Sequence, residues 1–461
     1  MPSLRNALDR RTFLSLAGSA FLIPAAASAP SKVLSQSLRE KILWTGVHIL
    51  QSCSAGEICK VNEEFPRILP ILTSKDPLYL PKINSVCRGE WGTPIGINRD
   101  LQLTWQRQEN NFRIDPNVKI GAFIGIAADT VLGAAYTANL DKTLTLYGIQ
   151  TYLIIFDVDK FEILQSYPMR IMSARDDDGN IGIDNQRIAN DMLNLLGYTP
   201  PSEDLERIWL PNLIFENLNK VSLKDNKPVN IRVTDVTVTK FTKDWLLKQN
   251  KDQNLYQGFL GHSLTQSISE VFKIGIQPHS PSRATYEITQ SFVAGGRNTL
   301  LFQKNLNTAP IDLEVRAKVR GIVTKEKPLE RYNNAVKEKT LLILFSIECG
   351  RWTRTYSPSD KQRLTPLDIT PKEAIFKQEI EILLKELRTD EFGNDWQMIL
   401  DLQQRAIDWF MKGVYSEDYQ NLATGFVQRG DQRFIKMRVN TKEVENFVGQ
   451  AIALRRNLLS A

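Results

Sequence analysis

Histidine and cysteine are scarce in this chain, which limits the chemistry that it can support. Its 461 residues include only three histidines and four cysteines. No two of His48, His262 and His279 are four residues apart, and Cys53 and Cys59 are spaced too widely for the cysteine pairs of zinc sites. The sequence also lacks the glycine-rich patterns that bind dinucleotides or nucleotide phosphates. We therefore predict no metal site, no cofactor and no catalytic residues.

Strong charge and long apolar runs are missing as well. The net charge is +6, and the first 29 residues hold Arg5, Arg10 and Arg11 against Asp9, which leaves +4 for the rest. A charge of this size does not indicate nucleic-acid binding. The best candidate for a membrane span, residues 120–136, contains Asp129 and several glycines. We expect buried strands there, and no transmembrane segment in the mature chain.

The N-terminus carries an export signal. The pair Arg10-Arg11 is followed by Phe13 and Leu14, which begin an apolar stretch too short to span a membrane. Small residues at positions 24–29 then resemble a cleavage site. The whole stretch resembles the twin-arginine (Tat) signal peptide of exported bacterial proteins, in which the Tat translocase reads the arginine pair and the two apolar positions after it. The resemblance covers residues 1–29 and implies delivery to the periplasm.

Export to the periplasm bears on the cysteines. In that oxidising compartment Cys53 and Cys59 could form a disulfide, or either could pair with Cys87. A Tat cargo folds in the reducing cytoplasm before export, so free buried thiols are an equal alternative. The connectivity stays open.

Residues 30–200 are expected to form a β-rich unit with a helix. Leu38, Ile42 and Leu43 suggest a short helix near its start. Residues 101–103 read as a short strand, 119–128 and 130–138 as two strands, and 144–157 as a central strand buried on both faces. The turn at 157–160 predicts a hairpin that continues to residue 173. Asp184 then predicts the start of a helix, ended by Gly197. Residues 200–226 read as a connection to the next unit, with one helical segment at 213–218.

Residues 227–360 are expected to form a second unit of order β-α-β-β-β. Valines and isoleucines alternate from 229 to 238 with a change of phase that predicts a bulge. Leu260, Leu264, Ile268 and Phe272 predict an amphipathic helix. Strands are expected at 286–292, 311–319 and 341–349. We expect the 311–319 strand to pack on that helix, with Val315 buried and Arg316 exposed.

Residues 365–461 are expected to be mainly helical. Thr370-Pro371-Lys372-Glu373 combines a capping box with proline at the first helical position, ahead of apolar residues that reach Leu387. Asn394 suggests a second helix that Gly413 ends. A hairpin around Gly430 and a last helix from Thr441 complete the segment.

Four short patterns invite a chemical interpretation. Gly261-His262-Ser263-Leu264-Thr265 is one residue away from the nucleophile elbow of α/β-hydrolases, but Ser263 lies within the helical pattern, and the only later histidine is His279. Residues 175–180 concentrate aspartates without the spacing of a calcium loop, which favours a solvated turn. Residues 351–356 interleave cations and aromatics, as a rim over a core edge or a stacking surface would. Residues 429–431 read Arg-Gly-Asp, which a hairpin turn explains.

The sequence therefore predicts an α+β protein with two antiparallel or mixed β-sheet units, packed helices and a helical C-terminal segment. We expect a soluble periplasmic protein that binds a protein partner, for example of the envelope, or a ligand, without catalysis. The alternative is a periplasmic hydrolase whose site converges only in three dimensions. Neither interpretation identifies the partner or the substrate.

Overall fold

The computed structural model describes residues 40–54, 67, 101–104, 119–137, 142–178, 185–196, 210–218, 221, 230–279, 284–292, 307–308, 311–330, 336–355, 368–389, 395–430 and 433–460. The signal-peptide positions Arg10, Arg11, Phe13 and Leu14, and the cysteines Cys59 and Cys87, lie outside these ranges. Residues 41–461 form one unit, which has the expected α+β composition. None of its described helices combines the length and the hydropathy that crossing a membrane would require.

The first sheet is built around a meander of three long antiparallel strands, β3 (Ile120–Thr137), β4 (Lys142–Asp157) and β5 (Glu162–Asp178). Strand β1 (Glu40–Ser54) pairs in parallel with β3, and the short β2 (Leu101–Thr104) lies at the edge beyond β1. Strand β7 (Ala284–Phe292) pairs with β1, and β8 (Asn307–Thr308) with β5. The predicted hairpin at 157–160 and the predicted strand at 101–103 are confirmed.

Strand β4 is buried on both faces, as predicted. Alternate side chains point to opposite faces of a strand, and here each face enters a different apolar core. Leu153 and Ile155 pack with the helices α5 (Asn185–Leu195) and α6 (Leu210–Leu218). Ile154 and Phe156 belong to the core on the other face. Both faces of the first sheet are therefore covered.

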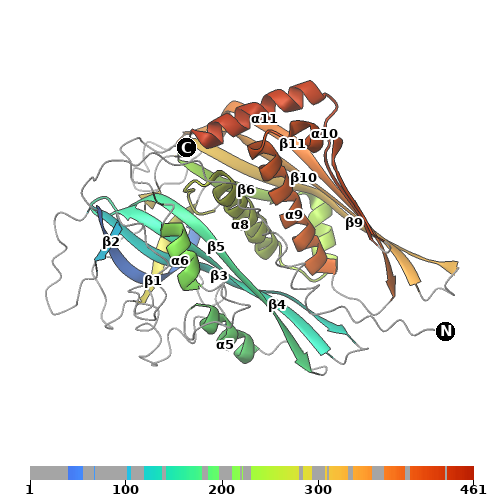
Figure 1. The fold of residues 1–461 in the computed structure, drawn as a ribbon, viewed down its shortest axis with the longest axis horizontal. Helices are drawn as coiled ribbons and strands as arrows, with labels where there is room; N and C mark the ends of the chain where they lie inside the picture. Colours follow the sequence, from blue (N-terminus) through green and yellow to red (C-terminus); the bar gives the residue numbers. More distant parts are fainter. Residues whose placement is uncertain are drawn as a thin grey trace, which may run out of the picture. The chain divides into compact units, whose positions relative to one another are not determined.

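The second sheet repeats this plan with six strands (Figure 1). Strand β6 (Ile231–Val238) pairs in parallel with β9 (Leu313–Pro328), and β9, β10 (Val336–Thr355) and β11 (Asp368–Thr389) form an antiparallel meander. The register shifts between Val233 and Val236, which confirms the predicted bulge. Strands β13 (Arg433–Val439) and β12 (Phe426–Arg429) extend the sheet at the β11 side, as a hairpin around Gly430.

Helices cover one face of the second sheet. Between β6 and β9 the chain forms α7 (Lys240–Lys248) and the long α8 (Gln253–Phe272), and after β11 it forms α9 (Asp395–Tyr415), α10 (Tyr419–Thr424) and α11 (Val444–Leu459). Side chains from these helices and the facing strand residues share a single core. Figure 1 shows α8 and α9 between the two sheets, and α8 contacts both β6 and β5. The predicted helix at 260–272 is confirmed.

The other face of the second sheet is polar and crossed by ion pairs. Arg438 on β13 makes two hydrogen bonds of 2.9–3.0 Å to Glu381 on β11. Lys377 lies 3.5 Å from Glu348 on β10, its register partner. Val315 is buried as predicted, whereas Arg316 is only half-buried, because it contacts Glu314 and stacks on Trp352. Opposite charges on neighbouring strands stabilise such a face modestly.

Three predictions about local structure are wrong. Ile42 and Leu43 lie in β1, not in a helix. The stretch from Thr370 to Leu387 is the strand β11, because pairing with β10 and β13 along its two edges overrides its helical periodicity and capping box. Residues 175–178 are the paired end of β5, not a turn.

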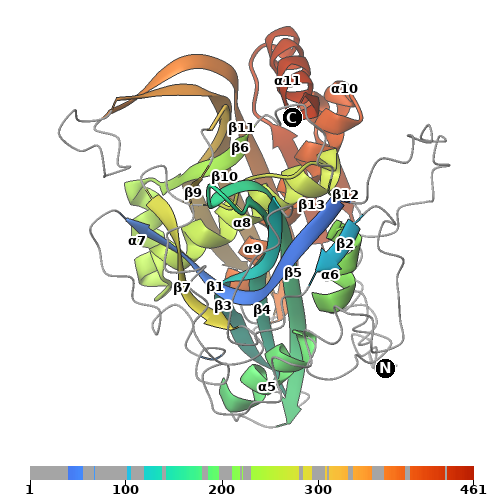
Figure 2. The same cartoon turned by 90° about the vertical axis from the view of Figure 1, so that its left-hand side faces the viewer.

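Three further differences concern the extent and the pairing of elements. The two strands expected between 119 and 138 are a single strand, β3, with two irregularities in its register. The strand 286–292, expected in the second unit, pairs with β1 in the first sheet, and Figure 2 shows β7 beside β1. Helix α9 runs through Gly413, where we expected it to end; a Cβ at this position would lie 2.6 Å from the Leu422 side chain, so the glycine serves packing and not helix termination. Strands β7 and β8 of the first sheet thus come from a distant part of the chain.

Candidate functional site

Two of the three histidines, His262 and His279, meet in a buried polar cluster between the first sheet and α8. His262 lies on α8, His279 lies seven residues after the end of that helix, and Tyr152 comes from the centre of β4. The Tyr152 hydroxyl bonds to Nδ1 of His262, and it accepts the backbone N–H of His279 at 3.4 Å. The two imidazole rings meet edge to face, with centroids 5.7 Å apart. Tyr152 thus hydrogen-bonds to two histidines that lie 110 and 127 positions later in the chain.

The chain after α8 holds His279 in place by bridging both sheets. Ile276 exchanges two backbone hydrogen bonds with Ser166 on β5, at 2.9 and 3.1 Å. The next residue, Gln277, donates its backbone N–H to the carbonyl of Ile231 on β6 at 2.8 Å. Residues 276–279 therefore act as a short strap between β5 and β6. Gly261 on α8 lets the His279 ring pack directly against the helix backbone, because a Cβ at position 261 would lie 2.2 Å from that ring.

Both histidines are held neutral. His279 Nδ1 lies 2.9 Å from the carbonyl of Val233, so this nitrogen carries the proton. Burial, with a smaller contribution from nearby Arg232, lowers the pKa of His279 to about 4, although the hydrogen bond to Val233 and the charge of Asp235 oppose that shift. The pKa of His262 is also well below its ordinary value, chiefly through burial, with contributions from His279 and Arg170. At neutral pH the cluster is a set of uncharged hydrogen-bonding groups.

A second polar group adjoins this cluster, around Arg170 on β5. Its guanidinium donates to Oε1 of Gln404 on α9 at 2.8 Å and lies 4.2 Å from the ring centroid of Phe259. Partial burial lowers the pKa of Arg170 to about 10, although Asp408 and Asp401 oppose that shift. The same burial raises the pKa values of both aspartates. Arg170 therefore joins the first sheet to both central helices.

Ser263 does not have the surroundings of a nucleophile. It is fully buried in the middle of α8 and not at a strand-to-helix turn, and its Oγ lies 3.5 Å from the guanidinium of Arg170. Within the described residues, no hydrogen bond joins Ser263 to a histidine. A cation beside the hydroxyl cannot accept its proton, so this geometry lacks the general base of a serine hydrolase. The helix-serine interpretation holds.

The remaining predicted residues are dispersed. Cys53 lies in β1, and Cys349 is a buried free thiol whose pKa burial raises. Residues 351–355 belong to β10, where Arg316 covers Trp352. Gly430 forms the hairpin turn, as predicted, and Asp431 lies outside the described residues. In the described ranges, no three His, Cys, Asp or Glu side chains are placed to hold a metal ion.

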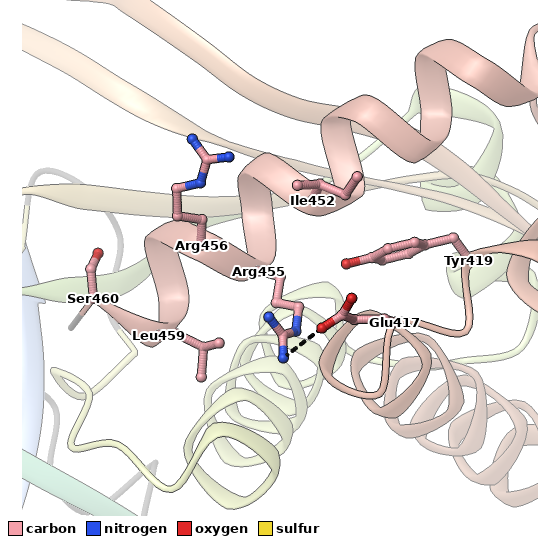
Figure 3. Close-up of a pocket in the computed structure, with 7 residues that line it drawn as sticks. All are labelled: Glu417, Tyr419, Ile452, Arg455, Arg456, Leu459 and Ser460. Carbon is pink, nitrogen blue, oxygen red and sulfur yellow. Dashed lines mark ion pairs between the residues drawn. The ribbon is translucent and has the colours of Figure 1, made fainter.

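A separate surface feature was not predicted from the sequence. A pocket of about 500 Å³ opens between the start of α10 and the last two turns of α11. Its walls are Tyr419, Ile452 and Leu459, and Arg455 crosses it to bind Glu417 at 3.0 Å (Figure 3). Glu417 has a positive φ of 62°, which is unusual for a residue with a side chain.

Most of the exposed large apolar side chains lie in the same C-terminal part of the chain that forms this pocket. The described chain has eight large hydrophobic residues with exposed side chains, and six of them lie after residue 414: Tyr415, Phe426, Val427, Val444, Ile452 and Leu459. Three of these, Val444, Ile452 and Leu459, lie on α11, beside its buried stripe of Phe447, Ala451, Leu454 and Leu458. We call α10, α11 and β12 the C-terminal surface. The periodicity of the sequence predicted the buried face of α11. The signal that could have predicted this surface was the set of further apolar residues of α11 that lie outside that periodicity, Ile452 and Leu459.

Comparison with known proteins adds no relationship: no protein-family model matches the chain, and no curated protein matches it significantly. Function must therefore be argued from the geometry alone.

Proposed function

We propose that this protein is exported by the Tat pathway and binds a protein partner in the periplasm through the C-terminal surface, without catalysis. The observation that carries the proposal is the concentration of exposed apolar side chains on α11 and β12, beside the pocket at Tyr419. Exposed apolar side chains gathered in one part of a chain are a feature of surfaces that a partner or ligand covers.

The polar cluster supports this interpretation over hydrolysis. Tyr152 hydrogen-bonds to the His262 side chain and to the His279 backbone, and among the described residues the Ser263 side chain hydrogen-bonds only to Arg170. Polar groups committed to one another in a core stabilise and specify the packing of elements. The cluster thus joins the first sheet to α8.

Photo-crosslinking in intact cells tests the binding proposal. Replacing Ile452, which is 42% exposed in the wall of the pocket, with benzoyl-phenylalanine should give a discrete covalent adduct with another protein on illumination. The same probe in place of Lys325, which is exposed near the end of β9, is the matched control and should give none. Equal adducts at both positions, or none at Ile452, would contradict the proposal.

Export has its own test. Arg10→Lys and Arg11→Lys together should leave the precursor in the cytoplasm, because the Tat translocase reads the arginine pair. The measurement is cell fractionation with an antibody against the mature chain. Normal delivery of the double variant to the periplasm would show that the Tat interpretation is wrong.

A further inference from the structure

We propose that the partner adds a β-strand to the free edge of β12, and that this strand alternates acidic and apolar residues. The inference rests on the proposed partner binding and specifies its chemistry. It is carried by the hydrogen-bond pattern of the β12–β13 hairpin and by the charges beside it.

Among the strands of the described residues, β12 forms one end of the second sheet. It pairs with β13, and all four of its side chains are exposed, Phe426 and Val427 by 42% and 45%. An uncovered edge strand presents unpaired backbone groups to any extended chain. Recognition by strand addition uses such an edge.

The hairpin turn fixes which backbone groups point outward. Gly430 and Arg433 exchange both backbone hydrogen bonds, at 2.8 and 3.4 Å, so they form a hydrogen-bonded pair. Such pairs alternate with non-hydrogen-bonded pairs along an antiparallel ladder. Gln428 and Phe426 therefore bond to β13, whereas the N–H and C=O groups of Val427 and Arg429 point away from it. These two residues offer four adjacent backbone groups to an incoming strand.

The side chains of β12 define the two faces that the incoming strand would meet. Phe426 lies opposite Met437, which is buried in the core, so an apolar residue of the partner would extend that core. Val427 and Arg429 lie on the polar face, opposite Lys436 and Phe434. In the described part of the chain, neither Arg429 nor Lys436 has an ion-pair partner. A carboxylate on the partner strand would supply one.

A second copy of this chain fits this edge less well. Pairing β12 with itself would bring two copies of Arg429 and Lys436 to one junction, without a carboxylate from β12 to compensate. Like charges on directly opposed positions are destabilising. The charge of the edge therefore favours an acidic strand from a different protein.

The direct test is binding of a capped, fluorescein-labelled peptide of alternating Val and Glu to the full mature chain, followed by fluorescence anisotropy. Two peptide series, N-methylated on every Glu or on every Val, remove the N–H groups that point to one edge of the peptide strand. Strand addition uses one edge only, so one series should lose binding at least about 10-fold while the other retains it. This comparison needs no change in the protein.

Variants of the edge give the complementary test. Val427→Pro removes an outward N–H without touching a bond to β13, and an edge strand tolerates proline at such a position. It should weaken the peptide about 10-fold, whereas Val427→Ala, which keeps the N–H, should stay within about threefold. Arg429→Glu should weaken the Val–Glu peptide and strengthen a Val–Lys peptide. Circular dichroism checks that each variant is folded.

The outcomes separate the two proposals. Equal effects of both N-methylated series, equal effects of Val427→Pro and Val427→Ala, or binding of neither peptide would each overturn strand addition. If one of these results is obtained but the probe at Ile452 still gives a crosslinked adduct, the protein binds a partner through α11 and not by strand addition to β12. If gel filtration shows that the chain self-associates and that the peptide prevents this self-association, a second copy of the chain occupies the edge of β12. That result would overturn the inference of an acidic partner.

Discussion

Acid should weaken this fold through His279, and the size of the effect follows from its surroundings. The ring is buried, donates Nδ1–H to the carbonyl of Val233, and has a pKa of about 4 in the folded protein. In an unfolded chain the pKa of histidine is about 6.5. Between these values the unfolded chain binds a proton that the folded protein does not.

The sign and magnitude follow from linkage. Since the unfolded state binds more protons between about pH 4 and 6.5, the free energy of unfolding falls as the pH falls through this window. For pKa values of about 6.5 and about 4, the loss between pH 8 and pH 5 is about 2 kcal/mol. His262 adds a loss of the same sign. Asp401 and Asp408 act in the opposite direction, because their raised pKa values make the folded state bind protons first.

Comparison with a variant isolates the contribution of His279. His279→Asn places an amide nitrogen near the position of Nδ1, so a donor to Val233 remains and no group titrates. Urea unfolding of both proteins at pH 8 and pH 5 gives two differences, and the wild-type loss should exceed the variant loss by about 2 kcal/mol. Any constant cost of the substitution cancels. If both proteins lose the same stability, His279 is not held neutral by burial and the reasoning fails.

Two further predictions concern packing. Gly261→Ala should lower the free energy of unfolding by about 1–3 kcal/mol, since its Cβ would overlap the ring of His279. Gly258→Ala on the same helix meets nothing within 4 Å, so it should raise the free energy of unfolding by about 0.5–1 kcal/mol. The two variants should shift the melting temperature in opposite directions, and equal shifts would contradict this prediction. Val315→Asp should cost several kcal/mol by placing a carboxylate in the core, whereas Lys318→Gln on the exposed face should change stability by less than about 0.5 kcal/mol. Similar losses in thermal melts would mean that the faces of β9 are assigned wrongly.

The sequence predicted the elements whose signals are local. The hairpin at 157–160, the bulge in β6 and helix α8 each depend on turn residues or on a periodicity within about 20 positions. The buried faces of β4 and β9 were also predictable, because alternating side chains record which face meets the core.

Predictions failed where distant pairing decides the structure. In β11 the residues Ile380, Ile382 and Leu384 alternate toward the core, yet Ile380, Leu383, Leu384 and Leu387 also fit a helix. Nothing local separates the two patterns, and the strand forms because β10 and β13 pair along both of its edges. Strand β7 was recognised as a strand, but its partner β1 lies more than 200 residues earlier.

The polar cluster was unpredictable for the same reason. His262 and Ser263 belong to the pattern that resembles a nucleophile elbow, and His279 is the only histidine after it. Their partners Tyr152 and Arg170 lie in β4 and β5, where the sequence predicts strands and no functional site. The hydrogen bond between Arg170 and Gln404 joins positions 234 residues apart. The motif in the sequence contained His262 and Ser263 but neither Tyr152 nor Arg170, to which their side chains hydrogen-bond.

The repeated topology of the two sheets explains why the cluster lies where it does. In chain order, each sheet starts with a strand that pairs in parallel with the first strand of a three-stranded antiparallel meander. These parallel pairs are β1 with β3 and β6 with β9, and each of them contains a register shift. Parallel pairing needs a crossover between the strands, and in the second sheet α7 and α8 provide it. Helix α8 then contacts β5 as well as β6, so one helical layer closes a face of each sheet. Tyr152 and Arg170 are the polar side chains that the first sheet presents to this layer, and their bonds to His262 and Gln404 fix its position against that sheet.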